Sequence, residues 1–106
     1  MKTYRVFLTD TANGDLRDIA FHILDQSKER DVALKFISEL RERCAALSSF
    51  PDRGAYPKDS VLKSAGYRYL VHKDYLVFYR IHGENVYVEG IFNAKKDYMR
   101  VLKRII

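Results

Sequence analysis

The chain has 106 residues, of which 47% are hydrophobic and 31% charged, with 19 Lys and Arg against 14 Asp and Glu. This length and composition are typical of one globular domain, spanning 1–106, and argue against collagen-like, mucin-like or disordered chains. No apolar run approaches the length of about 18 residues that a transmembrane helix needs. The first apolar run, Val6 to Leu8, is too short for a signal peptide, so we expect a cytoplasmic protein with no membrane partner.

The common motifs of metal, nucleotide and covalent chemistry are absent from the sequence. There is no GxGxxG, Walker loop, GxSxG or HExxH pattern. Cys44 is the single cysteine, which excludes an internal disulfide and a cysteine-cluster metal site. The histidines, His22, His72 and His82, lack metal-ligand spacing and fall at expected helix-surface or turn positions. We therefore expect no metal and no small-molecule cofactor.

Positive charge is concentrated in the second half of the chain. Residues 1–52 contain eight Lys and Arg against nine Asp and Glu, a net charge of −1. Residues 53–106 contain eleven against five, a net charge of +6. This asymmetry favours an anionic partner, either a phosphate-bearing one or an acidic protein segment.

The first elements are a short strand and two helices. Residues 4–9 alternate between apolar and polar and predict a strand. The stripe Leu16, Ile19, Ala20, Ile23 predicts an amphipathic helix, which Thr9 or Asp10 can cap. A second apolar stripe, from Ala33 to Leu47, predicts a longer helix that includes Cys44 as a core residue. The short connection indicates an antiparallel helical hairpin.

The second half of the chain has the pattern of a strand meander. Residues 48–66 contain both prolines and two glycines and are expected to be irregular. Strands are predicted at 67–71, 75–81 and 86–92, with connections short enough for antiparallel pairing, and a last helix within 94–106. The predicted order is β-α-α-β-β-β-α, an α+β domain with helices on one antiparallel-dominated sheet. An open second face of the sheet would be the natural binding surface.

Two arginines lie within predicted strands, where a guanidinium must reach water or a partner. Arg68 falls in the first strand of the meander and Arg80 near the end of the second. Together they suggest a groove for phosphate or carboxylate. The alternative is that each arginine pairs with an acid of the chain such as Asp74 or Glu89. Whether they share a face depends on the hairpin turn, which the sequence leaves open.

Other cations and tyrosines surround these strands. Five tyrosines fall in the predicted strands, where rings on a basic sheet can stack unpaired bases but more often serve the core. Further cations are found in the loop and at the C-terminus: Arg53, Lys58, Lys63, Lys95, Lys96, Arg100, Lys103 and Arg104.

Nearly end to end, these segments resemble the RelE/ParE superfamily, the toxins of type II toxin–antitoxin modules. The resemblance is carried by the opening strand and helix, the proline–arginine–glycine loop, the two central strands and the tail: residues 4–9, 12–19, 47–57, 66–70, 75–81, 86–91 and 95–102. It implies the α+β fold of that superfamily and a cognate antitoxin as partner. Plasmid stabilisation is a role of such modules.

The superfamily contains two activities, and the resemblance leaves both open. RelE-like members cut messenger RNA at the ribosome as metal-free ribonucleases, whereas ParE-like members bind and poison DNA gyrase. The loop Pro51–Gly54 and the strand at 75–80 recur in the ParE-like branch. Asn93 stands where many relatives carry a histidine, which argues against a histidine-dependent mechanism.

Residues near the positions that the ribonucleases use are the implied site. Arg68 or Arg80 would stabilise the phosphorane, and Tyr98 or a lysine would transfer protons. Arg53, Lys63, Lys95 and Lys96 would contact nucleic acid or another target. In a gyrase poison the same residues would be contact residues instead. The remaining alternatives are an inactive relative that only binds an antitoxin, and an unrelated basic RNA-binding domain.

Overall fold

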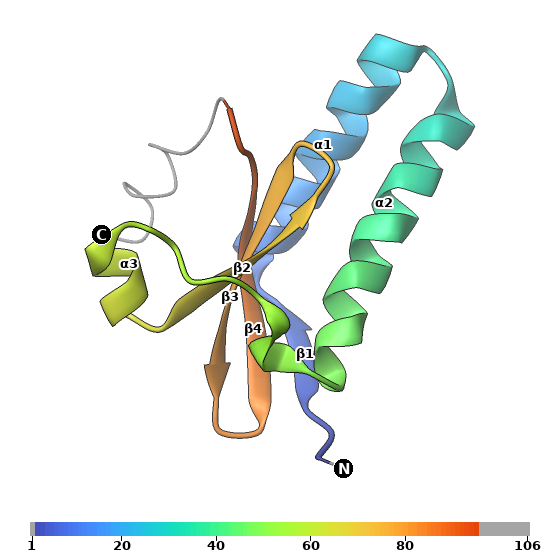
Figure 1. The fold of residues 1–106 in the computed structure, drawn as a ribbon. Helices are drawn as coiled ribbons and strands as arrows, with labels where there is room; N and C mark the ends of the chain where they lie inside the picture. The colour runs from blue at the N-terminus through green and yellow to red at the C-terminus, as the bar shows by residue number, and fades with distance from the viewer. Residues whose placement is uncertain (1, 96–106) are drawn as a thin grey trace.

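The computed structural model describes residues 2–95. In chain order the elements are β1 (Arg5–Leu8), α1 (Asp10–Ser27), α2 (Arg30–Ala45), η1 (Ala46–Ser48), η2 (Pro51–Arg53), α3 (Ser60–Ser64), β2 (Tyr67–His72), β3 (Tyr75–His82) and β4 (Asn85–Asn93). The helices α1 and α2 form an antiparallel hairpin, which packs on one face of the sheet (Figure 1).

Side-chain caps mark the start of α1 and α3, whereas the N-cap residue of α2, Glu29, makes no such hydrogen bond. The Thr9 side chain accepts a hydrogen bond from the Ala12 N–H and caps α1, as its position predicts. α1 ends at Lys28, which adopts a left-handed conformation with φ of 60°. The short helix α3 is capped in the same way as α1, because the Asp59 carboxylate accepts from the Leu62 N–H at 3.0 Å.

The four strands form one mixed sheet in the order β1-β4-β3-β2. β2, β3 and β4 are a continuous antiparallel meander, and β1 joins β4 in parallel at the far edge. A β-bulge interrupts the pairing of β3 with β4: Phe78 faces Gly90 and Tyr79 faces Val88, so Glu89 is the extra residue. This bulge determines where the Glu89 side chain is placed on the sheet.

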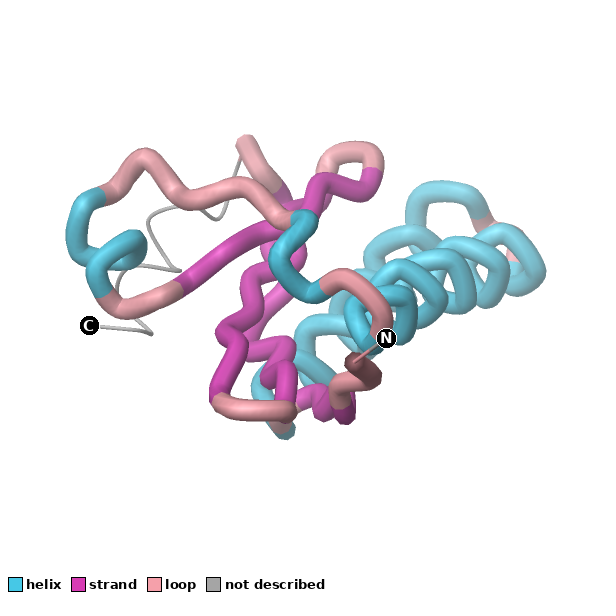
Figure 2. The backbone as a smooth tube through the Cα atoms, turned by 60° about the horizontal axis from the view of Figure 1, so that its bottom comes forward, coloured by secondary structure: helices cyan, strands magenta, loops and turns pink. Residues whose placement is uncertain are grey.

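The two faces of the sheet are covered differently. The main core lies between the sheet and the α1–α2 hairpin and includes Leu16, Leu40, Val77, Tyr79 and Val88. A smaller cluster on the other face joins Leu62 of α3 to Tyr67, Phe78 and Phe92. Figure 2 shows the helical hairpin on one side of the strands and the segment with α3 on the other. Since residues 2–95 cover this second face only in part, we call it the open face.

The predicted elements agree with those of the structure except in the segment 48–66 and at the C-terminus. The two helices and four strands are confirmed to within a few residues of their predicted bounds. The segment 48–66, expected to be irregular, contains the 3-10 helix η2 and the helix α3. The helix expected within 94–106 falls almost entirely outside the described residues. No helix in residues 2–95 has the length and apolar character needed to cross a membrane.

His72 occupies a partly buried position at the end of β2, not the solvated turn that the sequence suggests. Its ring meets Phe36 of α2 edge-on, with ring centroids 5.5 Å apart. Its Nε2 atom lies 3.9 Å from the Glu39 carboxylate, which also pairs with Lys73 at 3.5 Å. Burial lowers the pKa of His72, and the nearby Lys73 and Arg43 charges lower it further, while Glu39 opposes them.

The lowered pKa of His72 predicts a loss of stability in mild acid. Protonation is easier in the unfolded chain, whose histidine pKa is close to 6.5, than in the fold. The contribution is therefore complete above pH 6.5 and is lost as pH falls below 6.5 and through the lowered pKa of the folded state. Urea denaturation across this range should show a falling free energy of unfolding in the wild type and a flatter profile in His72→Gln.

The exposed imidazole of His22 on α1 provides the matched control. His22→Gln removes a histidine without touching the contacts of His72. An equal flattening in both variants would contradict the assignment of the effect to His72.

Candidate functional site

The strand register places the two strand arginines on opposite faces of the sheet. Arg68 lies opposite Tyr79, whereas Arg80 lies opposite Tyr67. Because neighbouring residues on a strand point to opposite faces, Arg68 lies on the face of the helical hairpin and Arg80 on the open face. The question that the hairpin turn left open is thus answered, and the two guanidinium groups do not share one groove.

Arg68 fixes the position of the loop that precedes α3. Its Nη1 donates to the backbone carbonyls of Asp52 and Gly54, each at 3.1 Å. Its Nη2 donates to the Tyr56 hydroxyl at 2.6 Å, and the guanidinium lies 4.2 Å from the centre of that ring. Since these contacts use donors on both terminal nitrogens, Arg68 is a positioning residue for the loop.

Tyr79 also fixes this loop, through hydrogen bonds of its buried hydroxyl. Its side chain is fully buried, yet its hydroxyl donates to the Pro51 carbonyl at 2.5 Å and accepts from the Gly54 N–H at 2.9 Å. Burial raises the pKa of Tyr79, which keeps the phenol protonated as a donor. The proline–arginine–glycine loop is therefore fixed to the sheet by two side chains, Arg68 and Tyr79.

The fixed loop presents cations and aromatic rings to solvent. The Arg53 guanidinium lies 5.7 Å from the centre of the exposed Phe50 ring, and its Nε donates to the Phe50 carbonyl at 3.0 Å. Lys63 of α3 lies 5.6 Å from the exposed Tyr56 ring. We call these residues the loop surface: Phe50, Arg53, Tyr56, Lys63 and Arg68.

The other predicted site residues are not brought to this surface. Lys95 follows β4, and its backbone N–H donates to the Asn93 side chain at 3.0 Å. Lys96 and Tyr98 lie outside the described residues. The predicted set therefore divides between the loop surface, the open face and the end of β4.

On the open face Arg80 is paired with Glu89, the alternative that the sequence offered. Its Nε donates to the Glu89 carboxylate at 2.5 Å, and this hydrogen bond raises the pKa of Arg80. Tyr67 donates to the other oxygen of Glu89 at 3.2 Å, and its ring lies 4.9 Å from the guanidinium. Burial and the Glu89 charge raise the pKa of Tyr67, so that its hydroxyl remains a donor.

The β-bulge aims Glu89 at Arg80 and is held by residues at the start of α1. The Thr9 hydroxyl approaches the Glu89 carbonyl at 3.5 Å, and Asp15 accepts from the Ile91 N–H at 2.9 Å. Bulges of this kind commonly redirect a side chain beside a functional site. Glu89 was considered only as a possible partner for Arg80 from the sequence, since a bulge leaves no mark in an apolar pattern.

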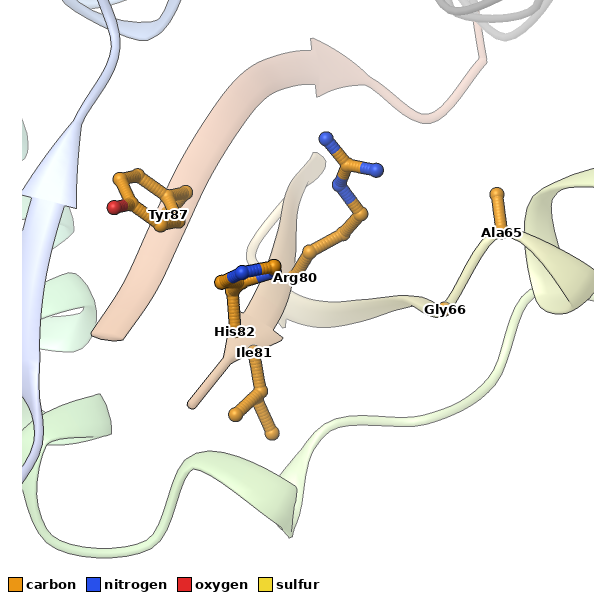
Figure 3. A pocket seen from close by; sticks show the side chains of 6 residues that line it. All are labelled: Ala65, Gly66, Arg80, Ile81, His82 and Tyr87. Carbon is orange, nitrogen blue, oxygen red and sulfur yellow. The ribbon is translucent and has the colours of Figure 1, made fainter. Parts of the chain in front are cut away.

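Two adjoining hollows on the open face meet at Arg80 and Ala65. One, of about 450 Å³, is lined by Ala65, Gly66, Arg80, Ile81, His82 and Tyr87 (Figure 3). The other, of about 400 Å³, is lined by Thr9, Thr11, Ala65, Tyr67, Phe78, Arg80, Glu89, Gly90 and Phe92. His82 and Tyr87 were not singled out as site residues from the sequence, because only strand pairing places them beside Arg80. Within residues 2–95 no group of His, Cys, Asp and Glu could hold a metal ion.

Comparisons with known proteins give this fold a family. The family model described as the ParE toxin of the type II toxin–antitoxin system parDE matches residues 6–98. The chromosomal ParDE toxin–antitoxin system of P. aeruginosa aligns with a TM-score of 0.74 and 21% identity, covering 88% of this chain and 98% of that one. The RelBE2 toxin–antitoxin complex of Mycobacterium tuberculosis aligns with a TM-score of 0.61 and 22% identity, covering 86% and 98%. No curated protein sequence matches the chain.

The helical hairpin and the mixed sheet are the α+β fold that the chain shares with these two solved structures. Because the family model covers most of the sequence, the chain belongs to the ParE toxin family of type II toxin–antitoxin systems.

Gly54 is the position where the pinned loop tolerates no side chain. A β-carbon there would lie 2.9 Å from the Tyr69 carbonyl oxygen and closer still to the Tyr79 hydroxyl. We expect Gly54→Ala to lower the free energy of unfolding by about 1–3 kcal/mol. In Gly14→Ala, by contrast, the nearest group is the Arg17 side chain at 3.7 Å, and a gain of about 0.5–1 kcal/mol is expected within α1. Urea denaturation measures both, and a neutral Gly54→Ala would contradict the close approach.

The fastening role of Arg68 predicts a conformational effect from a conservative change. Lysine keeps the charge but cannot donate to three acceptors in the geometry of a guanidinium. Arg68→Lys should therefore cost about 1–2 kcal/mol of stability and accelerate proteolytic cleavage within residues 50–58. Arg53→Lys, which alters an exposed local contact, is the control, and equal cleavage rates in the two variants would refute the role.

Proposed function

We propose that this toxin arrests growth by binding and poisoning DNA gyrase, as ParE-like members do, and that a cognate antitoxin neutralises it. The proposal rests on one observation: the guanidinium groups of the two strand arginines are already bound to other groups of the protein. Arg68 is committed to loop carbonyls and Arg80 to Glu89, on opposite faces of the sheet. Cleavage of RNA would need a cation for the phosphorane and proton-transfer groups gathered around one phosphate.

The resemblance to the ParE-like branch supports the same choice. The strand at 75–80 and the loop Pro51–Gly54 carry that resemblance, and the two segments are joined by hydrogen bonds in the structure. Tyr79 and Arg68 fix the loop, and the loop then presents the exposed cations Arg53 and Lys63. A rigid surface of arginine and aromatic side chains is a common form of protein-binding site. We therefore assign contact with gyrase to the loop surface.

The proposed antitoxin partner follows from charge and from the solved relatives. The P. aeruginosa and M. tuberculosis neighbours are toxin–antitoxin complexes. The net charge of +6 in residues 53–106 suits a partner segment that carries acidic residues. Binding of such a segment would neutralise the cations that the toxin needs for its target.

Expression of the chain alone in a bacterial host tests the proposal. We expect growth arrest with filamentation and a DNA-damage response, while messenger RNAs remain intact, and relief by the small open reading frame beside the gene. Purified toxin should inhibit supercoiling by gyrase. Ribosome-dependent message cleavage would instead establish the RNA-cutting activity, and absence of arrest would favour an inactive antitoxin-binding relative.

Substitutions separate the loop surface from the rest of the molecule. Arg53→Ala combined with Lys63→Ala should raise the toxin concentration needed to inhibit supercoiling about tenfold or more, since hot-spot cations often contribute over 1 kcal/mol. Lys35→Ala, which removes an exposed cation from α2, should leave inhibition unchanged. Tyr98→Phe, which removes a phenolic proton donor, should also have little effect on a gyrase poison.

A further inference from the structure

The α1–α2 hairpin carries large apolar side chains on its exposed side. Phe21, Leu24 and Leu34 are 68%, 38% and 55% exposed, whereas the core side of the same helices is buried against the sheet. Single exposed apolar residues are ordinary on protein surfaces, but a group of them on one face marks an interaction site. The positions of these three residues on the two helices show that they form such a group.

The exposed apolar residues belong to two stripes that run side by side. Each helix has a stripe of exposed residues at the spacing i, i+4, i+7: Arg17, Phe21 and Leu24 on α1, and Leu34, Ser38 and Arg41 on α2. Residues at this spacing share one face of a helix. Arg17 and Arg41 line the same hollow of about 410 Å³, so the two stripes begin together at the base of the hairpin. We call these six residues the hairpin surface.

The charge changes sign along the hairpin. At the base, the hollow that contains Arg17 and Arg41 has one acid, Asp10, and is net positive. At the tip, which extends beyond the strands in Figure 1, residues 25–31 contain three acids and two bases and are net negative. The exposed side chains of Phe21 and Leu34 lie between these two ends. Within residues 2–95 neither arginine of the hollow forms an ion pair, so both remain available to a carboxylate of another molecule.

We propose that the hairpin surface binds the hairpin surface of a second copy of this chain, with the two hairpins antiparallel. A two-fold axis through the apolar section brings the base of each hairpin to the tip of the other. The positive base then meets the negative tip twice, and Phe21, Leu24 and Leu34 of both copies are removed from water at the centre. A parallel arrangement would place the arginines of one copy against those of the other.

The length of the helices suits this dimer, and the small apolar section sets its strength. α1 and α2 have 18 and 16 residues, which makes them about 27 and 24 Å long, and two such hairpins together form a four-helix contact. A stable interface buries about 1,200 Å² or more, and three apolar residues per copy are few for that area. We therefore expect reversible association in the micromolar range. The loop surface shares no residue with the hairpin surface, so the inference does not depend on the proposed contact with gyrase.

Sedimentation velocity of the purified full-length toxin tests the dimer. The chain has a mass of 12.4 kDa. We expect a species of twice that mass to increase as the protein concentration rises from about 1 µM to about 200 µM, because self-association follows mass action. A monomer across the whole range would overturn the proposal.

Two substitutions and a matched control test the surface. Phe21→Glu and Leu34→Glu each put a carboxylate into the apolar section and should raise the dissociation constant of the dimer about tenfold or more. Val32→Glu makes the same change on α2 at a residue that is 43% exposed but about 200° around the helix from Leu34, and should leave it unchanged. Circular dichroism checks that each variant is folded. An unchanged dimer in Phe21→Glu and Leu34→Glu, or an equal loss in Val32→Glu, would refute the surface.

Charge reversal tests the antiparallel orientation. Arg17→Glu combined with Arg41→Glu makes the base negative, and Glu29→Lys combined with Asp31→Lys makes the tip positive. Each double variant should associate more weakly than the wild type, because base and tip then carry like charges, and an equimolar mixture of the two should restore the dimer. Wild-type association of the base variant alone would contradict the antiparallel arrangement.

The cognate antitoxin is the other occupant for which these measurements give a distinct result. A toxin that stays monomeric at every concentration, but loses affinity for its antitoxin in Leu34→Glu, would assign the hairpin surface to the antitoxin and refute the dimer. Self-association is measured without gyrase, so failure of the proposed function and failure of the dimer are separate outcomes.

Discussion

The buried hydroxyl of Tyr79 is the contact on which the arrangement of this toxin depends. A phenol in the core must find hydrogen-bond partners, because an unsatisfied buried polar group costs about 1–3 kcal/mol. The Pro51 carbonyl and the Gly54 N–H supply them, which draws the loop onto the sheet. The approach is so close that residue 54 has no room for a β-carbon. Once the loop is held, Arg68 can close over it and α3 can reach the other face.

The register of the meander then divides the molecule into two surfaces. Arg68 lies opposite Tyr79 and is therefore confined to the loop side. Arg80 lies opposite Tyr67 and is therefore confined to the open face. A slip of β3 by one residue would turn Arg80 toward the helical hairpin and bury its charge there. The loop surface and the open face therefore carry separate cations.

Much of this fold was predictable from local pattern, and most of the site was not. The apolar stripes of α1 and α2 and the alternation of the strands can be recognised from their periods. The Thr9 cap can be recognised from its position before α1. α3 was not predicted, because a helix of five residues between turns is too short to show a periodic apolar pattern. His82 and Tyr87 are placed beside Arg80 only by strand pairing, and Glu89 reaches it only through a bulge. Long-range register is information that single-sequence patterns do not contain.

The Arg80–Glu89 pair affects the geometry of the open face more than the stability of the fold. The two side chains are 46% and 22% exposed, so water screens their attraction and the pair adds little to stability. Its larger effect is geometric, since one carboxylate oxygen holds Nε and the other holds the Tyr67 hydroxyl. A guanidinium fixed in this way loses less side-chain entropy on binding than a free one. The bulge in β4, by providing Glu89, therefore fixes the orientation of the Arg80 guanidinium on the open face.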